Sequence, residues 1–231
     1  MKRSKFSLSN YKLFSTNMGP LVPIHFNEVI PGDTVQQATS LLVRVAPMVH
    51  PTMHPVHARV HHWFVPYRLI WDDWEDFITG GRDGKQIPSL PHFTPTNVAP
   101  STLSDYLGIP PGDYTGKDPI FSVLPHRAYG LIYNEWYRGQ DLVDPIAVQT
   151  TSGLDTEAYA LQNVAWEKDY FTTARPFAQK GPAVTIPLGD TAPVYGTPNG
   201  TDPNISKQAY WSQAFPGQTH FAAQALSLIH I

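Results

Sequence analysis

Histidines gather in one short stretch of the sequence, where they could bind a metal ion. Residues 50–62 hold five of the ten histidines of the chain, and the neutral imidazole is a common metal ligand. On a regular strand, however, His57 and His61 share a face but stand about 13 Å apart, at about 3.3 Å per residue. His61 and His62 point to opposite faces. We therefore expect no bound metal and predict histidines at strand ends and subunit contacts; an iron or zinc site formed by loop folding is the alternative.

Four carboxylates follow the histidines, at Asp72, Asp73, Glu75 and Asp76. Asp72 and Asp76 are four residues apart on one helix face, and such a pair could serve general acid–base catalysis. Four acids on one short helix are more typical of its solvated face. The sequence also lacks the nucleophile elbow, the zinc-protease motif, the phosphate-binding loop and the glycine-rich dinucleotide motif. We therefore expect neither an enzyme nor a cofactor.

Aromatic residues make up 12% of the chain and indicate a different kind of site. Several tryptophans could line a sugar pocket, so a lectin-like, carbohydrate-binding β-sandwich is the alternative function. The helical spacing of these residues favours packing in a core or an interface. The residues predicted for the core or an interface are Trp63, Phe64, Trp71, Trp74, Phe77, Tyr129 and Trp136.

Two strands and one helix must position these side chains. Residues 34–46 are rich in β-branched and apolar residues and predict a strand. Residues 56–65 alternate in character and predict a second strand, although one of its apolar-face positions is a histidine. Residues 68–78 change to helical spacing, and Gly80 should end this helix. Its apolar face comprises Ile70, Trp74, Phe77 and Ile78, with Trp71 beside them.

A second helix is predicted over residues 125–139, where proline stands at the start and glycine at the end. Gly130 inside this helix costs about 1 kcal/mol relative to alanine, so we expect a close packing contact there. One aromatic and apolar stripe should run along it, formed by Tyr129, Ile132, Tyr133, Trp136 and Tyr137.

The other stretches indicate loops and short strands. Residues 82–121 and 189–217 are rich in proline and glycine and predict loops, with one helical turn at "STLSDYLG" in the first. A short strand is predicted over residues 183–186, and weaker strand candidates lie near 192–195 and 220–225. We therefore expect short elements joined by long loops.

Residues 1–33 predict an extended arm, because proline and glycine interrupt any helix there. The tip of the arm carries Lys2, Arg3 and Lys5, which are the candidate DNA contacts. A solvated tip is the commoner role for such residues, and contact with DNA phosphates is the functional alternative.

The overall composition excludes several classes of protein. The formal net charge of −3 does not suit a chain that coats nucleic acid unaided. The absence of cysteine excludes disulfides, thiolate nucleophiles and cysteine-based zinc sites. No apolar run approaches the roughly 18 residues of a membrane helix, and no apolar segment follows the basic N-terminus as a signal peptide requires. We expect no membrane insertion.

Five longer segments carry a resemblance to a known family. They are "VIPGDT" (29–34), "LLVRVAP" (41–47), "FVPYRLIWDDWEDFITGG" (64–81), "LPHRAYGLIYNEWYRGQ" (124–140) and "DYFTTARPFAQKGPAVTIPLG" (169–189). In this order they resemble the N-terminal part of the major capsid proteins of the Microviridae, small single-stranded DNA phages, on the gokushovirus branch. The matching segments are spread over most of residues 1–190.

The resemblance implies a mainly β fold, namely an eight-stranded viral jelly roll with long loop insertions and a few short helices. Residues 34–231 would then be the N-terminal part of a jelly-roll domain that follows the arm. It also implies a homo-oligomeric, small icosahedral (T=1) shell around circular single-stranded DNA, assembled in the cytoplasm of the bacterial host. A small basic DNA-binding protein, other phage structural proteins and a bacterial surface receptor are the implied partners.

The resemblance raises an expectation about the end of the chain as well. Relatives continue well beyond 231 residues, whereas "HFAAQALSLIHI" matches them only to about Ser227. We count fewer strands than a jelly roll needs and expect a truncated chain whose sandwich is incomplete. Uncovered strand edges and the apolar tail "LSLIHI" should favour aggregation.

Overall fold

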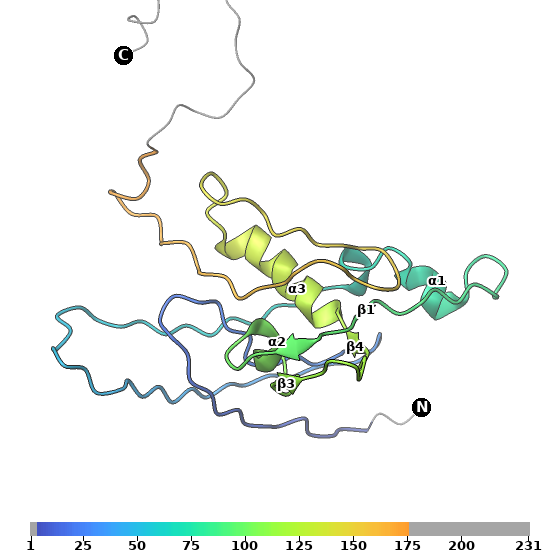
Figure 1. Ribbon diagram of the computed structural model, residues 1–231, viewed down its shortest axis with the longest axis horizontal. Helices are drawn as coiled ribbons and strands as arrows, with labels where there is room; N and C mark the ends of the chain where they lie inside the picture. Colours follow the sequence, from blue (N-terminus) through green and yellow to red (C-terminus); the bar gives the residue numbers. More distant parts are fainter. Residues whose placement is uncertain (1–3, 176–231) are drawn as a thin grey trace, which may run out of the picture. The chain divides into compact units, whose positions relative to one another are not determined.

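The computed structural model of the chain describes residues 4–175, and every structural statement below concerns them. Contacts divide the chain into two units, Met1–Thr173 and Ala174–Ile231, and the described helices and strands lie in the first (Figure 1). In chain order they are the 3₁₀ turn η1 (Tyr67–Leu69), α1 (Trp74–Thr79), β1 (His92–Phe93), β2 (Asn97–Val98), α2 (Leu103–Tyr106), β3 (Gly112–Asp113), β4 (Phe121–Ser122), α3 (Leu124–Ile132) and the π-helical turn η2 (Tyr133–Tyr137).

The described strands pair in two small antiparallel ladders. β1 pairs with β4, with His92 opposite Ser122, and β2 pairs with β3, with Asn97 opposite Asp113. These strands fall in or next to residues 82–121, so the prediction of loops there is correct only in part. Strands of two residues leave no alternating pattern in a sequence, whereas the predicted helical turn in this region is confirmed as α2.

The helix predicted over residues 68–78 is confirmed only from Trp74 onward. η1 forms the preceding turn, and the chain then leaves helical geometry at Ile70, where φ is −122°. The Ile70 carbonyl accepts a hydrogen bond of 3.0 Å from the Arg127 guanidinium, which draws this part of the backbone towards α3. At the other end α1 stops as predicted at Gly80, which adopts a left-handed φ of +81°.

The helix predicted over residues 125–139 is confirmed, with α3 running directly into η2. The π turn is defined by a hydrogen bond of 2.9 Å from the Arg138 amide to the Tyr133 carbonyl, five residues back. Gly130 makes the expected close contact, because a Cβ placed there would stand only 3.0 Å from Cγ2 of Val148.

The core lies around α1, α2 and α3. Ile70, Trp71 and Leu124 form a buried cluster, and Trp74 and Phe77 pack against it from α1. Around α2 and the start of α3, the buried apolar residues are Val98, Leu103, Tyr106, Ile109 and Val123. The buried apolar side chains named here therefore belong to residues 66–159, which we call the compact part.

The two strands predicted over residues 34–46 and 56–65 are wrong for the described structure. Residues 34–65, which we call the excursion, run out and back without regular structure (Figure 1). The Thr39 hydroxyl and His62 Nε2 lie 2.9 Å apart, so the outgoing and returning parts meet at this point. Among residues 4–175, no backbone–backbone hydrogen bond involves the excursion. A strand forms only when another backbone pairs with it, and the sequence pattern alone cannot supply that partner.

The predicted jelly roll therefore rests on family resemblance, since residues 4–175 contain only the two short ladders and two isolated bridges. The strands predicted at 183–186, 192–195 and 220–225 lie outside the described residues, as do the predicted loop 189–217 and the apolar tail.

Candidate assembly surface and the network behind it

The histidines of residues 50–62 do not converge in the structure. His50, His54 and His57 are exposed, and His62 contacts Thr39. His61 instead contacts the Tyr137 hydroxyl through Nδ1. In the part of the chain that the structure describes, no group of three or more metal-binding side chains comes together, and the absence of a metal stays a prediction.

Two of the four acids near α1 are bound rather than free. The Thr150 hydroxyl donates to Asp72 at 2.7 Å, and the Ser152 hydroxyl donates to Asp73 at 2.5 Å. Asp73 is half-buried, whereas Glu75 is exposed. The interpretation of all four acids as a solvated face therefore needs correction at Asp73, whose carboxylate fixes a neighbouring segment.

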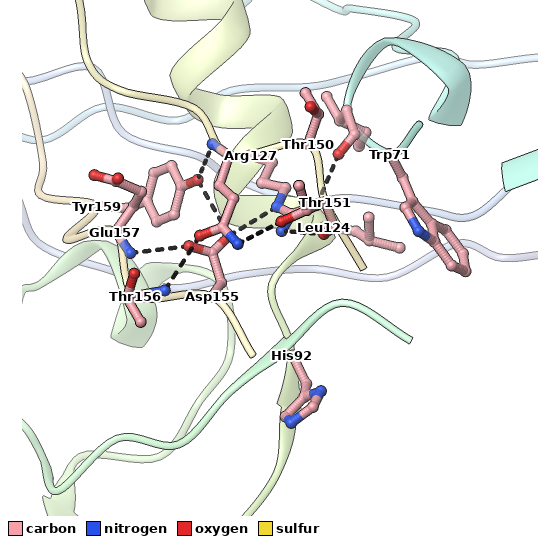
Figure 2. A network of polar contacts seen from close by, with 12 residues as sticks. Trp71, His92, Leu124, Arg127, Thr150, Thr151, Asp155, Thr156, Glu157 and Tyr159 are labelled. Carbon is pink, nitrogen blue, oxygen red and sulfur yellow. Dashed lines mark hydrogen bonds and ion pairs between the residues drawn. The ribbon is translucent and has the colours of Figure 1, made fainter. Parts of the chain in front are cut away.

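A buried ion pair joins α3 to that segment. Arg127 Nε donates to Asp155 Oδ2 at 2.7 Å, and both side chains are fully buried. The guanidinium also donates to the carbonyls of Ile70 at 3.0 Å and Thr151 at 2.9 Å, and the Glu157 amide donates to Asp155 Oδ1 at 2.9 Å. Figure 2 shows Arg127, Thr151, Asp155 and Glu157 facing one another beside α3. Because each charge has a charged partner and further hydrogen bonds, the pair is satisfied in its dry setting.

The low-polarity interior shifts the pKa values of neighbouring titratable groups. Burial lowers the pKa of His126 to about 4, against a smaller opposing effect of Asp155. Ser104 Oγ lies 3.0 Å from His126 Nε2, and Nδ1 is buried without a partner. Burial also raises the pKa of Tyr159 to about 12. The imidazole is therefore neutral at ordinary pH, and a proton on it would be poorly solvated.

Sequence reasoning missed the Arg127–Asp155 pair. One signal was available for Arg127, because it stands three residues after Leu124 and four before Leu131 on the apolar side of the helix. An arginine in such a row is unusual unless its charge is paired. Asp155 lies in an irregular segment and carries no comparable signal.

Residues of the predicted arm are tied to the compact part. The Tyr129 hydroxyl donates to the Leu21 carbonyl at 3.0 Å and accepts from the Gln162 amide at 2.8 Å. The Leu21 amide donates to the Gln162 carbonyl at 2.8 Å. Lys12 contacts the Tyr106 carbonyl at the end of α2, and burial lowers its pKa. Residues 12–24 are therefore fixed, without helix or strand of their own apart from one isolated bridge.

The candidate DNA contacts fall at the tip of the arm. Lys5 is exposed, while Lys2 and Arg3 lie outside the described residues. DNA contact by these three residues stays a prediction.

The residues predicted for the core or an interface fall into two groups. Trp71 and Tyr129 are buried, with Trp74 and Phe77 half-buried. Trp63, Phe64 and Trp136 are exposed, with Trp136 at 67%. The structure therefore places the first group in the core and leaves the second at the surface.

The aromatic stripe predicted along 125–139 also divides. Tyr129 and Tyr133 are buried, but Trp136 is exposed. In a regular α-helix Trp136, three residues after Tyr133, would share its face. The wider π turn rotates the following residues, so Trp136 leaves the buried row.

Four rings gather where the returning part of the excursion meets η2. The rings of Trp63 and Trp136 have centroids 4.8 Å apart, and those of His61 and Tyr137 stack at 5.8 Å. The Trp63 indole also donates to the Tyr137 hydroxyl at 3.2 Å. We call these four residues the tryptophan surface, because both indoles remain open to solvent.

Among residues 4–175, no helix is long and apolar enough to cross a membrane. The absence of membrane insertion stays a prediction.

Comparison with known proteins identifies what the chain resembles. A family model described as "Capsid protein (F protein)" matches residues 1–227. The chain is 39% identical over 204 residues to "Capsid protein VP1" of Bdellovibrio phage phiMH2K, with 85% of this chain and 37% of that protein covered. It is 34% identical over 228 residues to "Capsid protein VP1" of Chlamydia phage 1, with the same coverage, and 30% identical over 212 residues to "Capsid protein VP1" of Spiroplasma virus 4, with 83% and 37% covered.

The match runs through the compact part, the excursion and the N-terminal residues alike, so it does not depend on one motif. The chain spans little more than a third of the length of these relatives. The resemblance to Microviridae capsid proteins is confirmed, and the chain belongs to the "Capsid protein (F protein)" family.

Proposed function

We propose that the chain acts as part of a major capsid protein that self-assembles into a small icosahedral shell around a circular single-stranded DNA genome. The observation that carries this proposal is the family match over residues 1–227, together with three relatives named as capsid proteins. On this proposal the protein is structural, without enzymatic activity or cofactor, and works in the virion.

The proposed architecture is a viral jelly roll with inserted loops. The excursion supports it, because its outgoing and returning parts have the composition of strands but lack backbone partners among residues 4–175. In a jelly roll such segments pair with strands from other parts of the domain. Apart from Trp63, the exposed apolar side chains of the excursion would be covered where the two sheets of the jelly roll pack face to face.

The proposed partners are further copies of the protein, the packaged DNA, a small basic DNA-binding protein, other phage structural proteins and a bacterial surface receptor. DNA contact is assigned to Lys2, Arg3 and Lys5. The net charge of −3 supports a weak contact that needs a basic helper protein. Assembly is proposed to take place in the host cytoplasm. No observation favours the lectin-like alternative.

The test is electron microscopy of the chain in an assembling context. Residues 1–227 would replace the matching third of the phiMH2K capsid protein, and the chimaera would be expressed beside the chain alone. Closed shells from the chimaera are expected. A chimaera that stays monomeric, or a monodisperse chain that binds a glycan, would contradict the proposal.

A further inference from the structure

We infer that the tryptophan surface, formed by His61, Trp63, Trp136 and Tyr137, is a contact site for a second copy of this protein. The inference rests on the proposed capsid function and identifies one surface through which copies meet. The four rings come from segments more than 70 residues apart in sequence.

The tryptophan surface is built from fixed residues and yet is left uncovered by the rest of residues 4–175. Trp63 is 39% exposed and Trp136 is 67% exposed, although their rings pack at 4.8 Å. The π turn directs Trp136 away from the buried row of α3, at the cost of a less regular helix. An indole that is removed from its own core and still held in place is suited to an external partner.

Hydrogen bonds hold the tryptophan surface in place without a partner. The Tyr137 hydroxyl accepts the Trp63 indole N–H at 3.2 Å and contacts His61. Behind the turn, the Asn134 side chain forms two hydrogen bonds of 2.8 Å with the backbone of Ile146. Association then requires little ordering of side chains, and preorganised aromatic residues are frequent hot spots of protein interfaces.

The charges around the tryptophan surface favour a second copy of the protein as its occupant. The segments that meet here, residues 59–63, 133–138 and 165–167, carry the charged residues Arg59, Arg138, Glu135 and Glu167. Arg59 pairs with Glu167, and an amide–carbonyl bond of 2.9 Å from Ala165 to Tyr137 holds the third segment in place. Two cations and two anions leave no net charge, so another copy meets no repulsion.

The same charges argue against single-stranded DNA at this surface. Sites for single strands combine stacking aromatics with a groove of unpaired cations. Here the Arg59 guanidinium already has a carboxylate partner, and the exposed Glu135 would repel phosphates. We therefore do not propose nucleic acid as the occupant, and its binding is tested below.

The first experiment measures self-association of the full chain by sedimentation over a range of concentrations. Trp136→Ser and Trp63→Ser are expected to weaken association about tenfold or more, as truncation of a hot spot does. Trp136→Phe should retain most of it. Tyr11→Ser is the matched control, because Tyr11 is 88% exposed and lies elsewhere. Unchanged thermal midpoints would show that the variants fold; equal effects of the serine variants and the control would overturn the inference.

The second experiment uses the absence of cysteine in the chain. Glu135→Cys places one thiol beside the tryptophan surface, and Arg82→Cys places one on an exposed loop. A short bismaleimide should link copies through residue 135 several-fold more efficiently than through residue 82, and adding Trp136→Ser should abolish the difference. Equal yields at the two positions would contradict the inference.

Two further outcomes separate this inference from the proposed function. If the phiMH2K chimaera forms shells equally well with and without Trp63→Ser and Trp136→Ser, the inference fails and the capsid function stands. If the parent chimaera forms no shell, the capsid function fails. Quenching of tryptophan fluorescence by oligothymidylate or by a sugar, lost in Trp136→Ser, would assign the surface to another ligand and overturn the inference.

Discussion

The compact part and the excursion are both rich in apolar residues, but the compact part buries a cluster of them whereas the excursion leaves them exposed. In residues 66–159 the structure buries Ile70, Trp71 and Leu124 in one cluster. In residues 34–65 eleven large hydrophobic side chains are exposed, with Leu42 at 88%. The difference lies in partners, because the compact part contains helices that pack on one another while the excursion has no backbone partner among the described residues. Apolar content therefore does not by itself indicate a core.

The largest loss of stability in the compact part is expected on disruption of the buried ion pair. Arg127→Met should lower the free energy of unfolding by about 3–5 kcal/mol, because it leaves Asp155 buried without its charged partner. Urea unfolding followed by far-ultraviolet circular dichroism measures the loss. The double variant Arg127→Met/Asp155→Leu is the control and should be less unstable than the two single changes added together. A loss below about 1 kcal/mol would mean that the network does not hold the compact part together.

Acid should weaken the compact part through His126. Burial lowers the pKa of this imidazole to about 4 from an ordinary 6.5, so the unfolded chain binds the proton more readily. The stability from the neutral form is complete above about pH 6.5 and is lost as the pH falls towards 4, by roughly 2–3 kcal/mol. Unfolding free energies measured from pH 7.5 to 4 should show this slope.

Two variants isolate the His126 effect from other titrations. His126→Gln should flatten the slope between pH 6.5 and 4, whereas His57→Gln in the exposed excursion should leave it as it is. A slope that is the same in all three proteins would show that His126 does not cause the loss of stability in acid.

An intermediate loss of stability is expected for the half-buried residue Trp74. Trp74 packs against Tyr67 and Trp71, with ring centroids 4.6 Å and 5.9 Å away. Full burial of a tryptophan is associated with losses of about 3–5 kcal/mol on truncation to alanine, so Trp74→Ala should cost about 2 kcal/mol. Thermal and urea unfolding measure it, and no change in either would place α1 at the periphery.

The smallest effect is expected in the excursion. Phe64 is 79% exposed, and Phe64→Ser should change the free energy of unfolding by less than about 0.5 kcal/mol. The same substitution should nevertheless reduce aggregation of the chain, because it removes exposed apolar surface. Light scattering and urea unfolding test both parts. A loss of 2 kcal/mol or more would show that the excursion has a folded partner after all.

The two helices could be predicted from the sequence because their signals are local. Apolar spacing and the terminal glycines located the end of α1 and both ends of the continuous helix α3–η2 to within two residues, whereas the start of α1 was predicted six residues too early. The position of Gly130 inside the helix also predicted its close packing contact correctly. The π turn was not predicted, since nothing in "YNEWY" distinguishes it from an α-helical turn.

The features that could not be predicted depend on contacts between distant residues. Arg127 and Asp155 are separated by 28 positions, and the Tyr129 hydroxyl reaches Leu21 across 108. The strands expected in the excursion failed for the same reason, because alternation describes one segment and pairing needs two. The exposed tryptophans could not be separated from the buried ones without knowing which segments meet.

The hydrogen bonds that join Leu21 to Gln162 and Tyr129 also determine when the N-terminal segment can fold during synthesis. Residues 12–24 leave the ribosome early but cannot dock until residues 129 and 162 have been translated. At about 5–20 residues per second, synthesis of the intervening stretch takes on the order of 7–30 s. During that interval the nascent N-terminal segment, with exposed Phe6, Leu8 and Tyr11, is available to chaperones. Residues 12–24 are thus synthesised well before residues 129 and 162 but are held in place only after them.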